Sequence, residues 1–216
     1  MSALAFVPDL PVLAAFVLAC VAITLTPGPD MAFFLGKSVT QSAAAGFAAF
    51  AGCTTGLVVH TVLVAAGLAA LLAASATAFL VLKIVGAAYL LWLAFESVWK
   101  GNALSRPVAG AAPERLTRIY VKALTVNLLN PKVIVFFATF LPQFVTAGDP
   151  AASGKFLFLG LTMIVVSTPI TVAMILAAGR VSATLRGSRR LARAIDWLFA
   201  GVMGGFAARL LLSRAG

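Results

Sequence analysis

An acidic and a basic side chain interrupt long apolar stretches of this sequence, and each one directly follows a proline. The acid is Asp30, after Pro29, and the base is Lys132, after Pro131. In a chain that crosses a membrane, such ionisable residues mark substrate, ion or proton pathways. An acid and a base in one wet cavity can hold the ammonium and the carboxylate of a zwitterion. The chemistry predicted for them is binding and passage rather than bond making.

The first break is Pro27-Gly28-Pro29. Each proline removes a backbone donor and clashes with the preceding turn, so a regular helix cannot continue through it. Asp30 then stands at the start of any resumed helix, where a negative charge favours the helix dipole. The alternative is a simple helix end with Asp30 as a surface cap, but Met31–Leu35 remain apolar. The break is therefore predicted to lie inside the membrane, past its midplane.

The second break contains Asn127, Asn130, Pro131 and Lys132. The two asparagines are three residues apart and share a helix face. Pro131 suits the first position of a new half-helix, with Asn130 as its cap. We expect Lys132, the half-helix amides and both asparagines to receive a substrate carboxylate, and Asp30 to receive the ammonium or an exchanged proton. In the empty protein the acid and base are expected to neutralise each other; a Lys132 that snorkels to the surface is the alternative.

The sequence contains few residues that could support a proton relay, a metal site, phosphate binding or catalysis. His60, the only histidine, lies within an apolar span; a hydrogen-bonded packing role is favoured over a proton relay with Asp30. One histidine and two separated cysteines give no metal-ligand spacing. The segment 36–38 resembles the end of a phosphate-binding loop but lacks its first glycine. Without a Ser/His/Asp set either, the sequence predicts no metal, no cofactor and no enzyme.

The elements that position these residues are apolar spans. Of the 216 residues, 62% are hydrophobic and 10% charged, whereas soluble domains carry about 25% charged residues. This composition excludes a soluble globule and a disordered chain. About 20 apolar residues suffice for a helix to cross a bilayer. The predicted fold class is an all-α integral membrane protein with six transmembrane helices, at 10–35, 43–72, 77–98, 123–145, 156–178 and 194–212.

The positive charges are grouped between these spans. The net charge is +10, and eleven of the 16 Lys and Arg residues lie at Lys37, in 100–122 and in 180–193. These are the first, third and fifth connections. Positively charged loops stay on the cytoplasmic side of a membrane. Both termini are therefore predicted to be periplasmic, and the grouping argues against a nucleic-acid partner.

A single transporter domain is predicted for residues 1–216. A first repeat covers about 8–99, a cytoplasmic loop about 100–122 and a second repeat about 123–213. Three spans in each repeat give the two halves opposite orientations. Each half begins with a proline-broken span, as in transporters built from inverted repeats, in which one half rocks against the other.

Three motifs carry a family resemblance: LTPGPD at 25–30, KIVGAAYLLWLA at 83–94 and LNPKVIVFFATFLPQF at 129–144. Together they resemble the LysE/RhtB family of bacterial amino-acid exporters over essentially the whole chain. The resemblance implies secondary active export or antiport of amino acids or related metabolites, driven by a proton or membrane-potential gradient. It also implies an inner-membrane location and a homodimer. Asp30 matches the acid after the family's PGP turn, and 127–132 matches its second motif.

Two other functions stay open. A channel, or a carrier of inorganic cations or other small solutes, fits the same scaffold. A membrane-embedded assembly factor is less favoured because the short loops offer little surface for a soluble partner. The family covers many substrates, so the resemblance does not select one.

Overall fold

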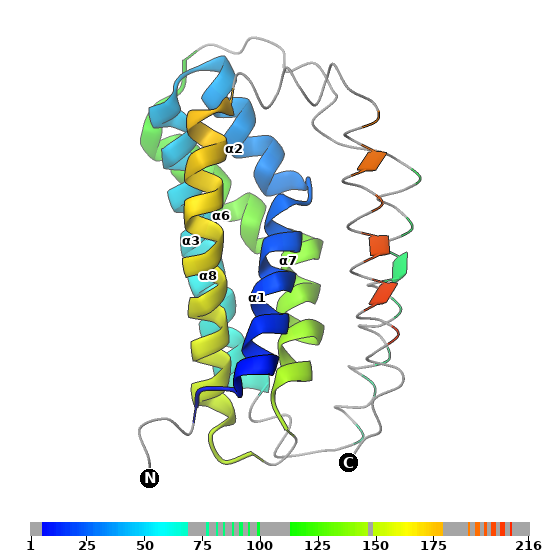
Figure 1. Cartoon of the computed structure of the whole chain (residues 1–216). Coiled ribbons are helices and arrows are strands. Elements are labelled where there is room, and N and C mark those ends of the chain that lie inside the picture. Colours follow the sequence, from blue (N-terminus) through cyan, green and yellow to red (C-terminus); the bar gives the residue numbers. More distant parts are fainter. Residues whose placement is uncertain are drawn as a thin grey trace.

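The computed structural model describes residues 6–68, 113–146 and 149–178, together with single positions between 77 and 99 and between 190 and 208. Every regular element within the three continuous ranges is helical (Figure 1). Two of the six predicted spans, 77–98 and 194–212, lie largely outside the described residues. The other four are described, and an all-α protein with apolar helices is confirmed.

Two helices are long and apolar enough to cross a membrane unbroken. The first is α3, Ala43–Leu63, which continues through a π-helical turn, η1, Val64–Leu68. The second is α8, Ala152–Leu176. The Ser42 side chain accepts a hydrogen bond from the Ala45 amide and so caps the start of α3, as serine commonly does at this position.

Both predicted helix breaks are present. In the first, α1 (Leu10–Leu25) and α2 (Pro29–Thr40) meet at an angle of 53°. In the second, α6 (Leu116–Leu128) is bent by 52° against a shorter helical run. That run consists of α7 (Pro131–Val135), the π-helical η3 (Phe136–Phe140) and the 3₁₀-helical η4 (Leu141–Phe144).

Helix α6 begins at Leu116, seven residues before the predicted start of the fourth span and inside the segment assigned to the cytoplasmic loop. The helix therefore extends beyond the apolar segment that predicts the span. Arg118 and Lys122 are exposed on one face of the helix, whereas Ile119 and Ala123 are fully buried on the other. An amphipathic helix end thus accommodates cations that the hydropathy pattern assigned to a loop.

Glycines set the distance between α3 and α6. A Cβ atom on Gly52 would lie 2.3 Å from the carbonyl oxygen of Tyr120, and one on Gly56 would lie 2.2 Å from Oδ1 of Asn127. Small residues four apart allow such close approach between membrane helices. The spacing of Gly52 and Gly56 on α3 is of this kind, and the close contact that it allows is made within the chain.

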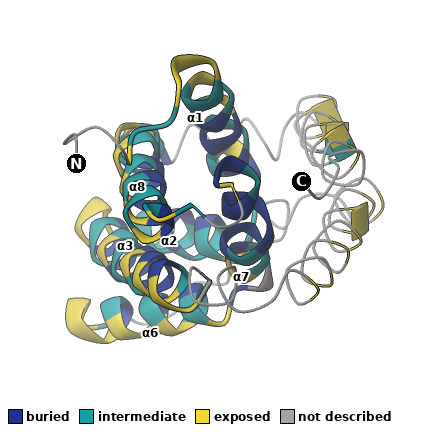
Figure 2. Cartoon of the chain, turned by 90° about the horizontal axis from the view of Figure 1, so that it is seen from below, coloured by how far each residue is buried: buried dark blue, intermediate teal, exposed yellow. Residues whose placement is uncertain are grey.

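Buried apolar residues form two clusters, one on each side of the helix breaks. The phenylalanine cluster joins α1 to η3, η4 and the first half of α8, with Phe136 and Phe140 stacked at 4.7 Å between ring centroids. The Ile119 cluster joins α2 to α3, α6 and the end of α8. Figure 2 shows the exposed residues of α3 and α6 on the outer side of the bundle, away from these clusters.

Helix α8 contains Pro169, which cannot donate to the carbonyl of Val165. Two hydroxyls just before the proline donate to a neighbouring carbonyl: Ser167 Oγ and Thr168 Oγ1 lie 3.1 and 2.7 Å from the oxygen of Ile164. Their acceptor is thus not the Val165 carbonyl that Pro169 leaves without its helical donor.

Candidate functional site

A cavity of about 90 Å³ lies where the two broken helices meet. The α1–α2 break contributes Asp30, and the α6–α7 break contributes Asn127, Asn130 and Lys132. A buried water needs roughly 10–15 Å³ by this measure, so the space accommodates several waters or a small solute. The structure therefore brings the four predicted binding residues together around one space.

The two breaks are joined by hydrogen bonds whose donors lie in the second break and whose acceptors lie in the first. Nδ2 of Asn127, from the second break, donates to Oδ2 of Asp30 at 2.7 Å. Nζ of Lys132, also from the second break, donates to the carbonyl oxygens of Thr26 and Ile23 at 2.8 and 3.0 Å. Asp30 and Lys132 both line the cavity, and Asn127 and the α1 backbone are among the groups that hold them there. Direct neutralisation of the acid by the base stays a prediction.

Pro27 explains why Lys132 binds the end of α1. In a continuous helix the amide of residue 27 would donate to the carbonyl of Ile23, but proline has no N–H. The C-terminal end of a helix also carries partial negative charge, which attracts a cation. Gly28 lies directly beneath the lysine, since a Cβ there would be 3.4 Å from its Cδ. Lys132 therefore turns into the site, and the snorkelling alternative is not the arrangement observed.

Two acceptor oxygens in the site are buried without a hydrogen-bond partner. They are Oδ1 of Asp30 and Oδ1 of Asn127. Asn127 is only 1% exposed. Buried acceptors in proteins nearly always have partners, and a carboxylate is an acceptor only. The Asp30 side of the cavity can therefore accept a hydrogen bond from a donor such as water or an ammonium group.

Asn130 caps the second half-helix as predicted. Its Oδ1 accepts a hydrogen bond from the amide of Lys132 at 3.0 Å, and Pro131 occupies the first helical position. This bond uses the first available amide of α7. The expectation that the half-helix amides receive a carboxylate is weakened accordingly, and the Lys132 ammonium remains as the cation at this break.

His60 lies behind the site rather than in it. Its Nε2 is 3.4 Å from the carbonyl oxygen of Asn127, and its ring lies 5.6 Å from that of Phe137. The side chain is buried and does not belong to the described cavity lining. This geometry fits the packing role favoured from the sequence. A proton relay between His60 and Asp30 would have to pass through Asn127.

Sequence reasoning missed several parts of the site. The acceptors for Lys132 are backbone carbonyls, for which residue type gives no signal. Cys53 from α3 lines the cavity as well, with no signal in the sequence. Ser167 and Thr171 from α8 also line it; hydroxyls beside Pro169 left a place on the pathway open as an alternative to a structural role at a kink. The close approach of Gly56 to Asn127 depends on the distance between α3 and α6.

Replacing Gly56 by alanine is expected to displace Asn127 and thereby break its bond to Asp30, because the new methyl group would overlap the Asn127 amide. Overpacking of this kind costs about 1–3 kcal/mol. The matched control is Gly67→Ala on the same span, where a Cβ meets nothing within 4 Å. Unfolding of both purified variants in detergent micelles measures the difference. Equal stability of the two variants would contradict the tight packing of Asn127 against α3.

Comparison with known proteins places the chain. Residues 21–214 match the family described as LysE type translocators. A homoserine/homoserine lactone efflux protein of Salmonella typhimurium is 34% identical over 177 residues, which cover 82% of this chain and 85% of that protein. A leucine efflux protein of Klebsiella pneumoniae is 31% identical over 195 residues, covering 90% and 92%.

A further relative has no assigned activity. It is an uncharacterized membrane protein of Vibrio cholerae, 30% identical over 209 residues that cover 96% of this chain and all of that protein. No solved structure matches the chain significantly. The family match spans nearly the whole sequence, including both proline breaks. The chain is a membrane protein that belongs to the LysE type translocator family.

Proposed function

We propose that this protein exports amino acids with uncharged side chains across the bacterial inner membrane, as a secondary active carrier. The observation that carries the proposal is the meeting of one acid and one base, from two broken helices, at a single cavity. The efflux activities in the names of two relatives support it. Both of those activities concern amino acids or derivatives without a charged side chain.

The two ends of the amino acid bind at different breaks. The ammonium group donates to Oδ1 of Asp30, an acceptor without a geometric hydrogen-bond partner among the described residues. The carboxylate takes hydrogen bonds from Nζ of Lys132, which exchanges the Ile23 and Thr26 carbonyls for it. Asn127 holds the Asp30 carboxylate in place through its own amide. Asn130 keeps the backbone of the second break fixed.

The rest of the cavity selects the side chain. Among the described lining residues, Asp30 and Lys132 are the charged ones, and a zwitterion uses both. The lining also includes the aromatic rings of Phe34, Phe136 and Phe137. A charged substrate side chain would lose its hydration there without a counter-charge, which costs several kcal/mol. Lysine, arginine, aspartate and glutamate are therefore rejected.

Transport follows from alternating exposure of this cavity. The first repeat, about 8–99, rocks against the second, about 123–213, so that the site faces each side in turn. A proton on Asp30, or the membrane potential, drives export, and His60 behind Asn127 is the nearest candidate for relaying that proton. Cytoplasmic positive loops and periplasmic termini complete the orientation, and the carrier forms homodimers.

Counterflow in proteoliposomes tests this proposal. Vesicles loaded with unlabelled leucine or homoserine should transiently accumulate the labelled form of either, and loading with lysine or glutamate should give no accumulation. Flux without counterflow would indicate a channel. Counterflow of inorganic cations alone would indicate the ion-carrier alternative, and no flux of any solute would favour an assembly role.

A further inference from the structure

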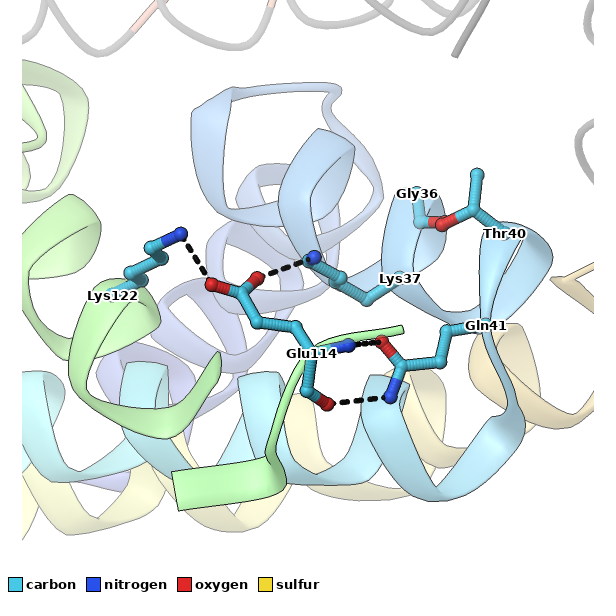
Figure 3. A network of polar contacts seen from close by, with 6 residues as sticks. All are labelled: Gly36, Lys37, Thr40, Gln41, Glu114 and Lys122. Carbon is cyan, nitrogen blue, oxygen red and sulfur yellow. Dashed lines mark hydrogen bonds and ion pairs between the residues drawn. The ribbon is translucent and has the colours of Figure 1, made fainter. Parts of the chain in front are cut away.

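Glu114 makes four hydrogen bonds to three residues at the end of the bundle where α2 ends and α6 begins (Figure 3). Its Oε2 accepts from Nζ of Lys37 at 2.8 Å, and its Oε1 accepts from Nζ of Lys122. Its backbone pairs with the side-chain amide of Gln41: Nε2 of Gln41 donates to the Glu114 carbonyl at 2.7 Å, and the Glu114 amide donates to Oε1 at 3.0 Å. The Glu114 side chain is 14% exposed and that of Lys37 16%.

These contacts join the two halves of the protein. Lys37 and Gln41 lie at the end of α2, in the first predicted repeat, whereas Glu114 immediately precedes α6 of the second broken helix. The contact at this end is therefore made between the two helices whose breaks form the cavity. Any movement that separates α2 from α6 has to break the bonds of Glu114 to Lys37 and Gln41.

The Glu114 contacts lie just beyond the cavity. Phe34 lines the cavity, and Lys37 follows it by three residues on α2, which is about one helical turn. Phe34, Met31 and Cys53 line the cavity and also belong to the Ile119 cluster. This apolar cluster therefore extends from the cavity lining to the ends of α2 and α6 where the Glu114 contacts lie.

We infer that Glu114 is the latch of the cytoplasmic gate: its contacts to Lys37 and Gln41 hold α2 against α6 and keep the cavity closed to that side. The inference rests on the proposed transport function, which requires the cavity to open there. Loading of substrate from the cytoplasm then requires these contacts to break and the Ile119 cluster to part. Glu114 acts through α2 and touches no substrate, so it is a positioning residue.

The latch does not work as a pH switch in the physiological range. Hydrogen bonds from Lys122 and Lys37 lower the pKa of Glu114 to about 2. At a pH above its ordinary pKa, near 4.5, the Glu114 carboxyl is ionised and attracts the two lysines. It loses this attraction only as the pH falls through the lowered pKa. The groups that face it, Lys37 and Lys122, are amines. Between pH 5 and 8 the carboxylate therefore stays ionised.

Cys53 provides a reporter for opening. It lines the cavity, whereas Cys20 is fully buried in the phenylalanine cluster and does not. In a Cys20→Ala background, a membrane-impermeant thiol reagent added to inside-out vesicles should label Cys53 slowly. Glu114→Gln should raise that rate about 3–10-fold, the range expected for losing two partly exposed ion pairs. The ratio between variant and parent should be the same at pH 5 and pH 8.

Three further variants, and vesicles of the opposite, right-side-out orientation, provide the controls for this test. Gln41→Ala and Lys37→Met should also raise the labelling rate, and they guard against a folding defect specific to Glu114→Gln. Asp149→Asn breaks the Asp149–Lys155 pair at the opposite end of α8 and should leave it unchanged. The inference is overturned if Glu114→Gln, Gln41→Ala and Lys37→Met all leave the labelling rate unchanged. It is also overturned if they speed labelling only in right-side-out vesicles. The labelling experiment contains no amino acid, so it tests the latch independently of the substrate. Faster labelling in variants of a protein that shows no amino-acid counterflow would contradict the proposed substrate and still support the latch.

Discussion

Replacing Asp30 by asparagine should reduce leucine or homoserine counterflow about 100-fold while leaving the protein folded. The variant has nearly the same shape, and its side-chain oxygen still accepts the hydrogen bond from Asn127 that Oδ2 accepts now. What is lost is the negative charge that pairs with the substrate ammonium. Removing one partner of a buried charge pair costs about 2–5 kcal/mol, and about 3 kcal/mol corresponds to about 100-fold in affinity.

The measurement separates two roles of this carboxylate. Counterflow runs without a net driving force, so it reports substrate binding and the opening of both gates. Uphill efflux against a substrate gradient reports energy coupling in addition. If Asp30→Asn loses both activities, the carboxylate binds the ammonium. If it keeps counterflow and loses only uphill efflux, the carboxylate carries the coupling proton and binding lies elsewhere.

The Asp30 prediction has a matched control variant and one result that would contradict it. Asp149→Asn removes a carboxylate of the same type from the ion pair with Lys155, away from the cavity, and should transport normally. Normal counterflow and normal uphill efflux of Asp30→Asn, with a comparable amount of protein in the vesicles, would remove Asp30 from the mechanism. The cavity would then need another acceptor for a substrate cation.

The helix breaks could be predicted from the sequence because proline acts locally. Pro27-Gly28-Pro29 places two prolines around a glycine, and Pro131 follows an asparagine that can cap a new helix, so both segments favour a break. The structure contains both bends, whereas the single Pro169 is accommodated inside α8. The cap by Asn130 is predictable for the same reason, since it joins residues two positions apart. The meeting of Asp30 and Lys132 at one cavity was expected from the predicted symmetry of the two halves. This symmetry is weaker evidence than the local effect of proline, but it led to the correct pair of breaks.

The hydrogen-bond partners within the site could not be predicted, because they depend on distances between helices. Lys132 binds backbone carbonyls of α1, and every residue has such a carbonyl. The bond from Asn127 to Asp30 could not be expected from charge alone, because Asn127 stands beside Asp30 only where Gly56 lets α6 approach α3 closely. The Glu114 contacts were missed for a similar reason, since Gln41 recognises a backbone that the hydropathy pattern assigned to a loop.

Lys132→Met should lower both transport and stability, and a second substitution should separate the two effects. The lysine donates to two carbonyls at the end of α1, and hydrogen bonds from charged donors contribute about 1.5–3 kcal/mol each. Methionine fills similar space without donating, so we expect a loss of about 2–4 kcal/mol in the free energy of unfolding in mixed micelles. Counterflow should fall to the background, because the carboxylate has lost its cation.

The rescuing substitution is Pro27→Ala, because an alanine amide at position 27 can donate to the Ile23 carbonyl that the proline leaves without a helical donor. In the double variant, Pro27→Ala with Lys132→Met, about 1–2 kcal/mol of the lost stability should return, a coupling of the size found between residues in contact. Counterflow should not return, since an amide turned into a helix cannot bind the substrate carboxylate. Additive stability effects would show that Lys132 does not replace the missing proline donor. Restored counterflow would show that the lysine serves only the α1 backbone and that the substrate carboxylate is bound by another group.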